Sequence, residues 1–375
     1  MNNFKLIKRS IEKRVRESLF KGRAVIIYGP RRSGKTTLIK EVQKTYPESH
    51  YYNCEEPDIN MALTDKTSTE LKSYFGKSNL IFLDEAQKIR NIGTTIKLIV
   101  DSYPEIQIVA TGSSSFDLSN KIIEPLTGRK IEFFLYPLTL AELSVSLNKL
   151  DANRLLETRI IYGMYPEIIF GEKETNLREI TKSYLYKDAL QYQDIRNPEI
   201  IEKLLQALAL QIGKEVSYNE LANFVEADKK TVQRYIRILE QAFVIYRLKT
   251  LSRNPRNDLK KLRKIYFWDT GIRNALINNL NPLTLRQDVG ELWENFLISE
   301  RLKNNSNLGK EFNYYFWRGL YGKEIDLIEE LGGKLYSYEI KWKNKKFNIP
   351  KAFSNSYPDS KVTVVNKDNY LDFTT

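Results

Sequence analysis

The chain has very little of two residues on which many catalytic centres depend. Cys54 is the only cysteine and His50 the only histidine among 375 residues. These counts exclude a disulfide framework, and they leave too few ligands for a zinc site built from cysteine and histidine. Catalysis is therefore expected from carboxylates, lysines, arginines and hydroxyl groups. A single thiol is typical of proteins that work in a reducing cytosol.

Long apolar runs are also missing. The N-terminal stretch MNNFKLIKRSIEKRVRESLF spaces its apolar residues among many charges, so it lacks the continuous apolar segment of a signal peptide. No run is long enough to span a bilayer. The sequence therefore predicts a soluble cytoplasmic protein without a membrane partner.

Basic residues outnumber acidic ones. Lys and Arg total 59 against 47 Asp and Glu, which gives a net charge of +12. Such an excess attracts the phosphate backbone of nucleic acids, but it also arises from a lysine-rich composition alone. Both explanations stay open at this point. The length allows two or three domains with cores of their own.

The first informative motif is AVIIYGPRRSGKTTLIKEV, which begins at Ala24. An apolar strand, a glycine-rich turn and a helix from about Lys35 follow one another, as in a P-loop that wraps backbone N–H groups around phosphates. Lys35 is expected to reach the β- and γ-phosphates of ATP, and Thr36 to offer its hydroxyl to Mg²⁺. The predicted nucleotide-binding residues are Gly29, Pro30, Arg31, Arg32, Ser33, Gly34, Lys35, Thr36 and Thr37.

The second motif is NLIFLDEAQKI, an apolar strand at 80–83 that ends in Asp84 and Glu85. A continuous apolar run is typical of a buried parallel strand, and ligands of α/β sheets bind at the carboxyl ends of such strands. Asp84 is therefore predicted to hold Mg²⁺, and Glu85 to polarise the attacking water. Together the two motifs predict an ATPase that uses ATP and Mg²⁺.

The ordered segments GPRRSGKTTL, LIFLDEAQ, IQIVATGSSSF and PLTGRKIEFFLYPLTLAEL resemble the AAA-type P-loop ATPases of archaea and bacteria that carry a C-terminal domain of unknown function. The resemblance implies a sensor group near the γ-phosphate, at Ser113 or else at Thr111. It also implies that Arg129 contacts the γ-phosphate within its own subunit or from a neighbour, which would require a homo-oligomer. The alternative for Arg129 is a surface arginine that caps a turn.

Residues 137–200 are helical in pattern and resemble the lid of this family. The following stretch KEVSYNELANFVEADKKTVQRYIRILEQAFVIYRL has the pattern of a winged helix, with a short helix at 218–225 and a longer one from Lys229. On the longer helix the polar face holds Lys230, Gln233, Arg234 and Arg237. This face fits DNA phosphates, although winged helices also bind proteins.

The C-terminal part resembles the restriction-endonuclease-like superfamily. A helix carries Glu294, and two strands joined by a Gly-Gly turn carry Asp326 on one strand and Glu339 with Lys341 on the other. The resemblance implies a nuclease centre in which Asp326 and Glu339 hold the metal, Glu294 completes its shell and Lys341 orients the nucleophile. The alternative is a plain hairpin with a solvent-facing ion pair.

The predicted fold class is α/β. The expected order is an N-terminal helix in 1–20, a P-loop ATPase core with a parallel sheet in 21–136, a helical lid in 137–200, a winged helix in 201–255 and a restriction-endonuclease-like domain in 256–375. The predicted function is that of an ATPase that acts on or at DNA through its C-terminal domains, with or without cutting the DNA. The alternative is a nucleotide-dependent switch that binds a protein partner and carries an inactive nuclease-like domain.

Overall fold

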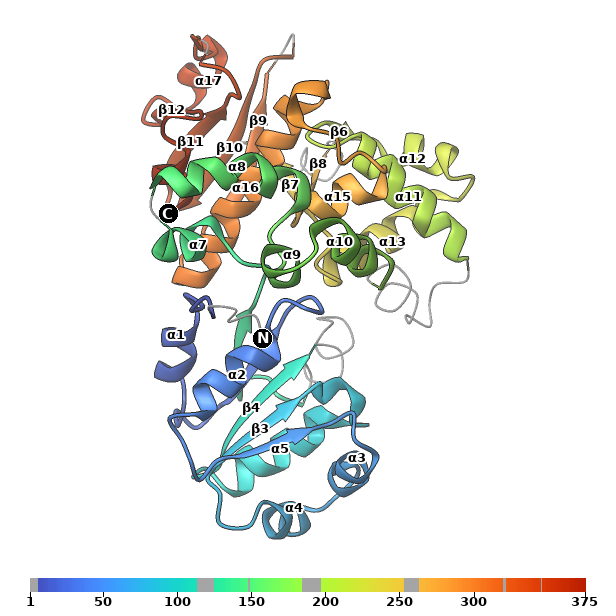
Figure 1. Ribbon diagram of the computed structural model, residues 1–375, viewed down its shortest axis with the longest axis vertical. Coiled ribbons are helices and arrows are strands. Elements are labelled where there is room, and N and C mark those ends of the chain that lie inside the picture. Colours follow the sequence, from blue (N-terminus) through green and yellow to red (C-terminus); the bar gives the residue numbers. More distant parts are fainter. Residues whose placement is uncertain are drawn as a thin grey trace. The chain divides into compact units, whose positions relative to one another are not determined.

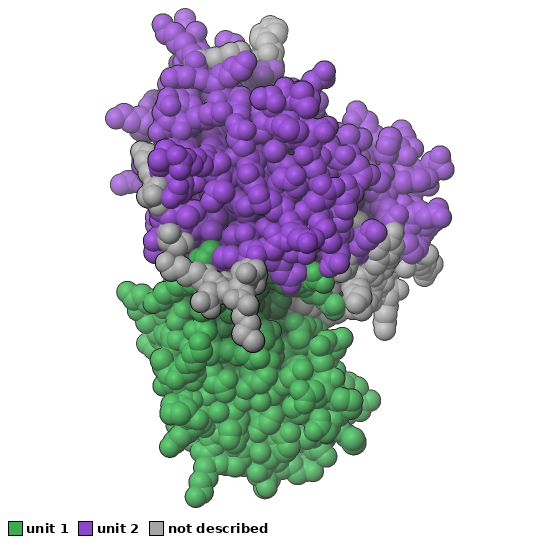
Figure 2. Space-filling view, viewed as in Figure 1, with its two compact units in different colours: residues 1–137, 241–243 green, residues 138–240, 244–375 purple. Residues whose placement is uncertain are grey.

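The computed structural model describes residues 6–112, 125–147, 149–183, 197–252, 263–319, 322–344 and 346–375. The chain forms two compact units (Figure 2). Unit 1 holds residues 1–137 with 241–243, and unit 2 holds residues 138–240 with 244–375. Each unit has its own β-sheet.

Unit 1 is built on a parallel sheet of five strands in the order β2-β3-β4-β1-β5. All five residues of β1 and all five of β3 are buried, which explains their continuous apolar sequences. The fold is the parallel α/β sheet of P-loop NTPases, as the sequence predicted. The strands are β1 (Ala24–Tyr28), β2 (His50–Asn53), β3 (Leu80–Asp84), β4 (Gln107–Gly112) and β5 (Lys130–Phe134).

Helices α1 and α2 pack on one face of this sheet. Their apolar residues Val15, Leu38 and Val42 share a buried cluster with Val25 of β1 and Phe82 of β3. Helix α2 follows β1 after the glycine-rich segment and packs against β4 (Figure 1). The helices of unit 1 are α1 (Glu12–Glu17), α2 (Lys35–Gln43), α3 (Pro57–Leu63), α4 (Ser68–Phe75), η1 (Ala86–Lys88) and α5 (Ile92–Ser102).

Unit 2 begins with four helices whose sequence pattern suggested a lid. Helices α8 and α10 pack against α15, and α8 also packs against α16. The first of the four starts with a capping box in which Thr139 and Glu142 satisfy each other's backbone N–H groups. The four helices are α7 (Leu140–Ser146), α8 (Lys149–Tyr162), α9 (Pro166–Phe170) and α10 (Lys173–Ser183), and α15 comprises Thr270–Leu276.

The sheet of unit 2 has seven strands in the order β12-β11-β10-β9-β7-β8-β6. Strands β6 and β7 and helices α12 and α13 lie in the range 201–255 with the winged-helix pattern, whereas β8 lies in the range 256–375 that was expected to be restriction-endonuclease-like. Strand β7 pairs in parallel with β9, so this segment and the C-terminal segment share one sheet. The bounds are α11 (Pro198–Leu210), β6 (Glu215–Val216), α12 (Tyr218–Phe224), α13 (Lys229–Gln241), β7 (Ile245–Thr250) and β8 (Arg263–Phe267).

The C-terminal segment follows the order helix, three strands, helix, strand, helix. Strands β10 and β11 form an antiparallel hairpin whose turn, Gly332 and Gly333, has φ angles of 58° and 80° that favour glycine. The elements are η3 (Leu283–Leu285), α16 (Val289–Leu308), β9 (Asn313–Arg318), β10 (Glu324–Leu331), β11 (Lys334–Ile340), α17 (Lys351–Ser356), β12 (Val362–Val365) and α18 (Tyr370–Thr374).

The expected ranges after residue 137 do not form separate compact units, because the helices, the shared sheet and the C-terminal segment all belong to unit 2. As domain boundaries they stay predictions. In the part of the chain that the structure describes, no helix combines the length and the apolar character needed to cross a membrane.

Candidate functional site

The glycine-rich loop lies between β1 and α2, where the sequence predicted it. Gly34 precedes the helix with φ of 96°, a left-handed conformation that glycine adopts without strain. Gly29 is required for a different reason, because a Cβ atom there would lie 2.2 Å from the backbone oxygen of Leu135. The chain after β5 therefore presses against the start of the loop.

Lys35 is buried at the first position of α2, with 4% of its surface exposed. Its Nζ donates to the backbone oxygens of Gly29 (3.0 Å) and Pro30 (2.9 Å), so the ammonium lies inside the curve of the loop. An ammonium held there is placed to bind phosphate oxygens that enter the loop.

Arg9 contacts the loop from a segment that precedes the motif by about twenty residues. Its Nη1 donates to the backbone oxygen of Ser33 (2.7 Å), and its Nη2 donates to the backbone oxygen of Tyr136 (2.7 Å). The side chain is buried, with 8% exposed. Arg9 thus ties the glycine-rich loop to the chain after β5, and no motif in the sequence pointed to it.

Asp84 ends β3 and accepts three hydroxyl groups. Thr36 Oγ1 and Tyr51 OH each donate to Oδ2 over 2.7 Å, and Thr111 Oγ1 donates to Oδ1. Thr36 and Asp84 were both predicted to hold Mg²⁺, although they lie far apart in the sequence. In the structure their side chains are in direct contact. A hydroxyl beside a carboxylate is a donor set that suits a hard cation such as Mg²⁺.

Tyr51 was not expected at this site. It lies on β2, which pairs with β3 in the register Tyr51 to Phe82, and this pairing brings its hydroxyl to Asp84. Burial, followed by the hydrogen bond to Asp84, raises the pKa of Tyr51. The phenol therefore stays protonated and serves as a hydrogen-bond donor to the carboxylate.

Glu85 follows Asp84 with φ of 53°, a conformation that is uncommon for a residue other than glycine. Its carboxylate accepts a hydrogen bond of 2.6 Å from Gln87 Nε2, and its backbone N–H donates to Thr111 Oγ1 over 3.2 Å. Thr111, the alternative to Ser113 as the predicted sensor group, thus forms hydrogen bonds with both Asp84 and Glu85. Ser113 itself lies outside the described residues.

Arg129 lies just before β5. Its Nε donates to Asp101 Oδ1 over 2.5 Å, and 40% of its side chain is exposed. The contact with Asp101 is compatible with the surface arginine that we named as the alternative. Arg31 is half-buried and Arg32 is exposed with φ of 60°, and both remain predicted nucleotide-loop residues.

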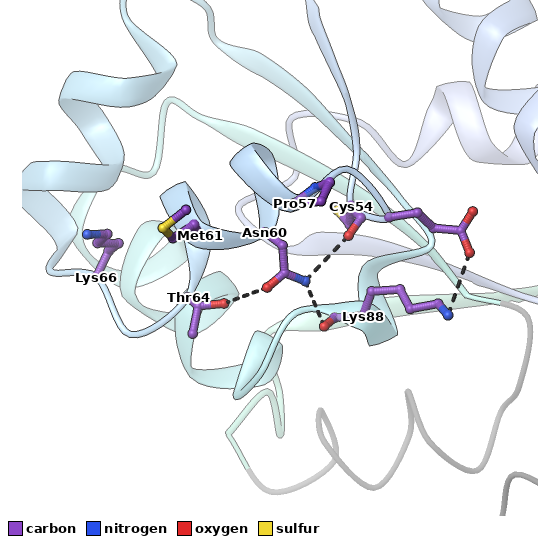
Figure 3. Close-up of a pocket in the computed structure, with 8 residues that line it drawn as sticks. Cys54, Pro57, Asn60, Met61, Thr64, Lys66 and Lys88 are labelled. Atoms are coloured by element: carbon purple, nitrogen blue, oxygen red, sulfur yellow. Dashed lines mark hydrogen bonds and ion pairs between the residues drawn. The ribbon is translucent and has the colours of Figure 1, made fainter.

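A separate cavity of about 740 Å³ lies in unit 1 beside α3 (Figure 3). Asn60 points toward the centre of the residues that line the cavity, and its Nδ2 donates to the backbone oxygen of Lys88 over 2.8 Å. Cys54 also lines it, but burial, with the charges of Asp84 and Glu85, raises the pKa of its thiol to about 12. The thiol is therefore a poor nucleophile at neutral pH.

The four residues of the predicted nuclease centre come together in unit 2. Asp326 and Glu339 are each 3% exposed and lie on neighbouring strands, so Asp326 is not part of a solvent-facing ion pair with Lys341, the alternative for this hairpin. Lys341 Nζ bonds Glu339 Oε1, and the Ile340 N–H donates to Asp326 Oδ2 over 2.7 Å. Burial, together with the nearby charge of Glu294, raises the pKa of Asp326 well above its ordinary value.

Lys264 of β8 is a fifth member that the sequence did not reveal. Its Nζ lies 3.1 Å from Glu294 Oε1, 3.4 Å from Glu324 Oε2 and 3.9 Å from Asp326 Oδ1. Although burial lowers the pKa of Lys264, the charges of these carboxylates outweigh it and leave the pKa raised. Over the described ranges no three His, Cys, Asp or Glu side chains are grouped so as to hold a metal ion.

Helix α13 exposes a basic face in unit 2. Lys230, Arg234 and Arg237 are exposed, whereas Val232 and Ile236 are buried, as the spacing predicted. The helix begins after Asp228, whose side chain accepts hydrogen bonds from the backbone N–H groups of the first turn. Glu240, near the end of the same helix, forms its ion pair with Arg247 of β7.

Three family models match separate parts of the chain. An AAA domain matches residues 21–144, and two domains of unknown function match residues 153–283 (DUF8612) and 289–374 (DUF4143). An uncharacterized protein of Mycobacterium tuberculosis is 29% identical over 341 residues, which are 89% of this chain and 74% of the relative. An uncharacterized protein of Haemophilus influenzae is 25% identical over 376 residues, which cover 92% of this chain and 86% of that protein.

Among solved structures, the Walker-type ATPase PABY2304 of Pyrococcus abyssi covers 72% of this chain and 96% of its own, with 17% identity and a TM-score of 0.49. The ORC2 protein of Aeropyrum pernix, solved as ADPNP-ADP complexes, covers 72% and 91%, with 14% identity and a TM-score of 0.39. The glycine-rich loop, the contact between Thr36 and Asp84 and the AAA match over 21–144 agree with one another. The chain therefore contains a P-loop AAA-type ATPase domain in residues 21–144 and a C-terminal domain of unknown function in residues 289–374.

Proposed function

We propose that this chain hydrolyses ATP with Mg²⁺ and uses the nucleotide state to control DNA binding through α13, without cutting the DNA. The observation that carries the ATPase part is the convergence of Thr36 and Thr111 on Asp84, with Lys35 inside the adjacent loop. These groups combine a phosphate cradle with a hard-cation donor set in one place.

The predicted site residues of unit 1 have distinct roles in this proposal. Lys35 binds the β- and γ-phosphates, and Thr36 and Asp84 hold Mg²⁺, which neutralises phosphate charge when bound. Glu85 orients the attacking water, and Thr111 keeps the Glu85 backbone in place through its 3.2 Å hydrogen bond. Arg129 and Ser113 stay candidates for the γ-phosphate contact, with Arg129 acting in its own subunit or from a neighbour in a homo-oligomer.

The DNA part rests on the basic face of α13. The order α11, β6, α12, α13, β7, β8, with β8 paired to both β6 and β7, is the order expected of a winged helix. In that fold the longer helix enters a groove of DNA, and exposed Lys230, Arg234 and Arg237 would contact phosphates there.

A protein partner is the second class that this unit can serve. A winged helix binds proteins as well as DNA, and the basic face of α13 would then meet an acidic surface. In that case the chain would be a nucleotide-dependent switch whose nuclease-like centre is inactive. Binding measurements with DNA separate the two classes.

The test follows ATP turnover by phosphate release and DNA binding by fluorescence anisotropy. We expect Mg²⁺-dependent turnover that Lys35→Ala abolishes, and binding of a DNA duplex that weakens steeply with salt. The double variant Lys230→Ala/Arg237→Ala removes two predicted phosphate contacts, so the slope of log K against log salt should fall by about 2.

The matched control is Lys310→Ala/Lys361→Ala, which removes the same charge from exposed positions outside α13. It should leave the salt slope unchanged. A wild-type chain that binds no duplex at low salt, or an equal loss in both double variants, would contradict the DNA part. Turnover that survives Lys35→Ala would contradict the ATPase part.

A further inference from the structure

Six charged side chains meet at one place in unit 2. Four are carboxylates, Glu294, Glu324, Asp326 and Glu339, and two are ammonium groups, Lys264 and Lys341. Lys341 bonds Glu339, which leaves Lys264 with the other three carboxylates. Lys264 is 1% exposed and its partner Asp326 is buried, whereas the Glu324 side chain is 34% exposed, so solvent screens the contact with Asp326 least.

The Lys264 ammonium occupies the space between carboxylates that a metal ion would need. Its Nζ lies 3.1 to 3.9 Å from one oxygen each of Glu294, Glu324 and Asp326. A divalent ion bound by the same oxygens would lie 2.0 to about 2.6 Å from each of them. The two cations cannot share a space of this size, and their like charges repel.

We infer that the Lys264 ammonium is the resident cation of this acidic centre and that Lys264 and a divalent metal ion exclude one another there. The metal that the nuclease-like arrangement implies does not fit the residues as they stand. With Lys264 in place the centre lacks the ion that would activate a nucleophilic water on DNA.

Among the described residues, one buried side-chain atom of the centre has no hydrogen-bond partner. Glu339 Oε2 is buried and accepts no hydrogen bond, whereas Oε1 bonds Lys341. A buried carboxylate oxygen without a donor costs free energy, so it would gain from a cation once Lys264 is removed. In a variant without Lys264 we therefore expect Glu294, Glu324 and Asp326 to take up the metal, with Glu339 Oε2 as a further oxygen that can join them.

The position of Lys264 is fixed by its strand. Lys264 pairs with Glu215 of β6 and Leu248 of β7, and its Nζ lies 5.6 Å from the centre of the Phe316 ring. It also lines a cavity of about 530 Å³ together with Glu324 and Arg318. The cavity gives ions in solution a route to the centre, so exclusion by Lys264 concerns occupancy rather than access.

The test counts Mn²⁺ bound by the nucleotide-free full-length chain, with the free ion measured by electron paramagnetic resonance. We expect wild type and Asp326→Asn to bind the same number of ions, because no ion of wild type depends on Asp326. Lys264→Met should bind one additional ion, and wild type should not bind that ion even at about tenfold higher Mn²⁺ concentration, since the repelling charge is removed only in the variant. Lys264→Arg keeps the cation and should bind no additional ion.

The double variant Lys264→Met/Asp326→Asn shows whether the additional ion is bound at the acidic centre or at the nucleotide site. An ion bound at the acidic centre is lost in the double variant, whereas an ion at the nucleotide site is kept. Circular dichroism shows whether Lys264→Met is folded, and Lys264→Gln replaces it if it is not. The inference is overturned if Asp326→Asn binds one ion fewer than wild type. This comparison holds even if neither Lys264→Met nor Lys264→Gln folds. A folded Lys264→Met without the additional ion overturns it as well.

Discussion

Tyr51→Phe is the substitution that best probes the site around Asp84. It removes one hydroxyl and no carbon, so packing on β2 is conserved. The hydroxyl donates to Asp84 Oδ2 over 2.7 Å, and the carboxylate is only 3% exposed. Water therefore cannot easily replace the lost donor.

The size of the effect follows from the remaining partners of Asp84. A hydrogen bond to a charged group contributes about 1.5–3 kcal/mol. Thr36 still donates to the same oxygen and Thr111 to the other, so the carboxylate keeps two donors and the loss lies at the lower end. A loss of about 1.5 kcal/mol corresponds to a roughly tenfold fall in kcat/KM for ATP.

The assay is phosphate release at varied ATP and Mg²⁺, with Tyr52→Phe as the matched control. Tyr52 is the next residue on β2, and its hydroxyl lies near His50 rather than Asp84. We expect Tyr51→Phe to raise the Mg²⁺ concentration for half-maximal rate and Tyr52→Phe to leave it unchanged. Rates within twofold of wild type for Tyr51→Phe, or an equal fall in both variants, would refute the role of Tyr51 at Asp84.

Three further predictions concern the loop and the stability of unit 2. Gly29→Ala places a Cβ against a backbone oxygen and should lower ATP affinity by at least about tenfold, whereas Gly290→Ala, with open space around it, should not; nucleotide titration decides. Arg9→Ala should raise KM for ATP more than it lowers kcat, with partial recovery in Arg9→Lys. Burial raises the pKa of Asp288, but Arg286 and Arg273 outweigh it and lower the value to about 2. The ionised Asp288 therefore adds about 1–2 kcal/mol to the free energy of unfolding above pH ~4, and this contribution is lost as the pH falls toward 2. In acid unfolding experiments, Asp288→Asn should not show this pH-dependent loss of stability.

The nucleotide loop could be predicted from the sequence because its chemistry is local. Gly29, Gly34 and Lys35 lie within seven consecutive residues, and each is required by backbone geometry or by phosphate charge. The strand that ends at Asp84 was equally clear, because a strand buried on both faces has a continuous apolar sequence. The P-loop fold followed from these two segments.

Tyr51 and Arg9 could not be predicted, because their roles depend on which segments become neighbours. Tyr51 reaches Asp84 only because β2 is the edge strand next to β3 in the order β2-β3-β4-β1-β5. Strand order is set by packing of the whole unit and leaves no mark on the sequence near Tyr51. Lys264 could not be predicted for the same reason, because its partner Asp326 lies on another strand of the seven-stranded sheet.

The parallel pairing of β7 with β9 has a consequence for how this protein can be inherited. The two matches of unknown function meet between residues 283 and 289, and this boundary divides one sheet. Recombination that carried residues 289–374 alone into another gene would leave β9 with an open edge, which promotes aggregation. It would also leave Glu294 and Asp326 without the Lys264 charge. Selection should therefore keep both segments in one gene, in the same order.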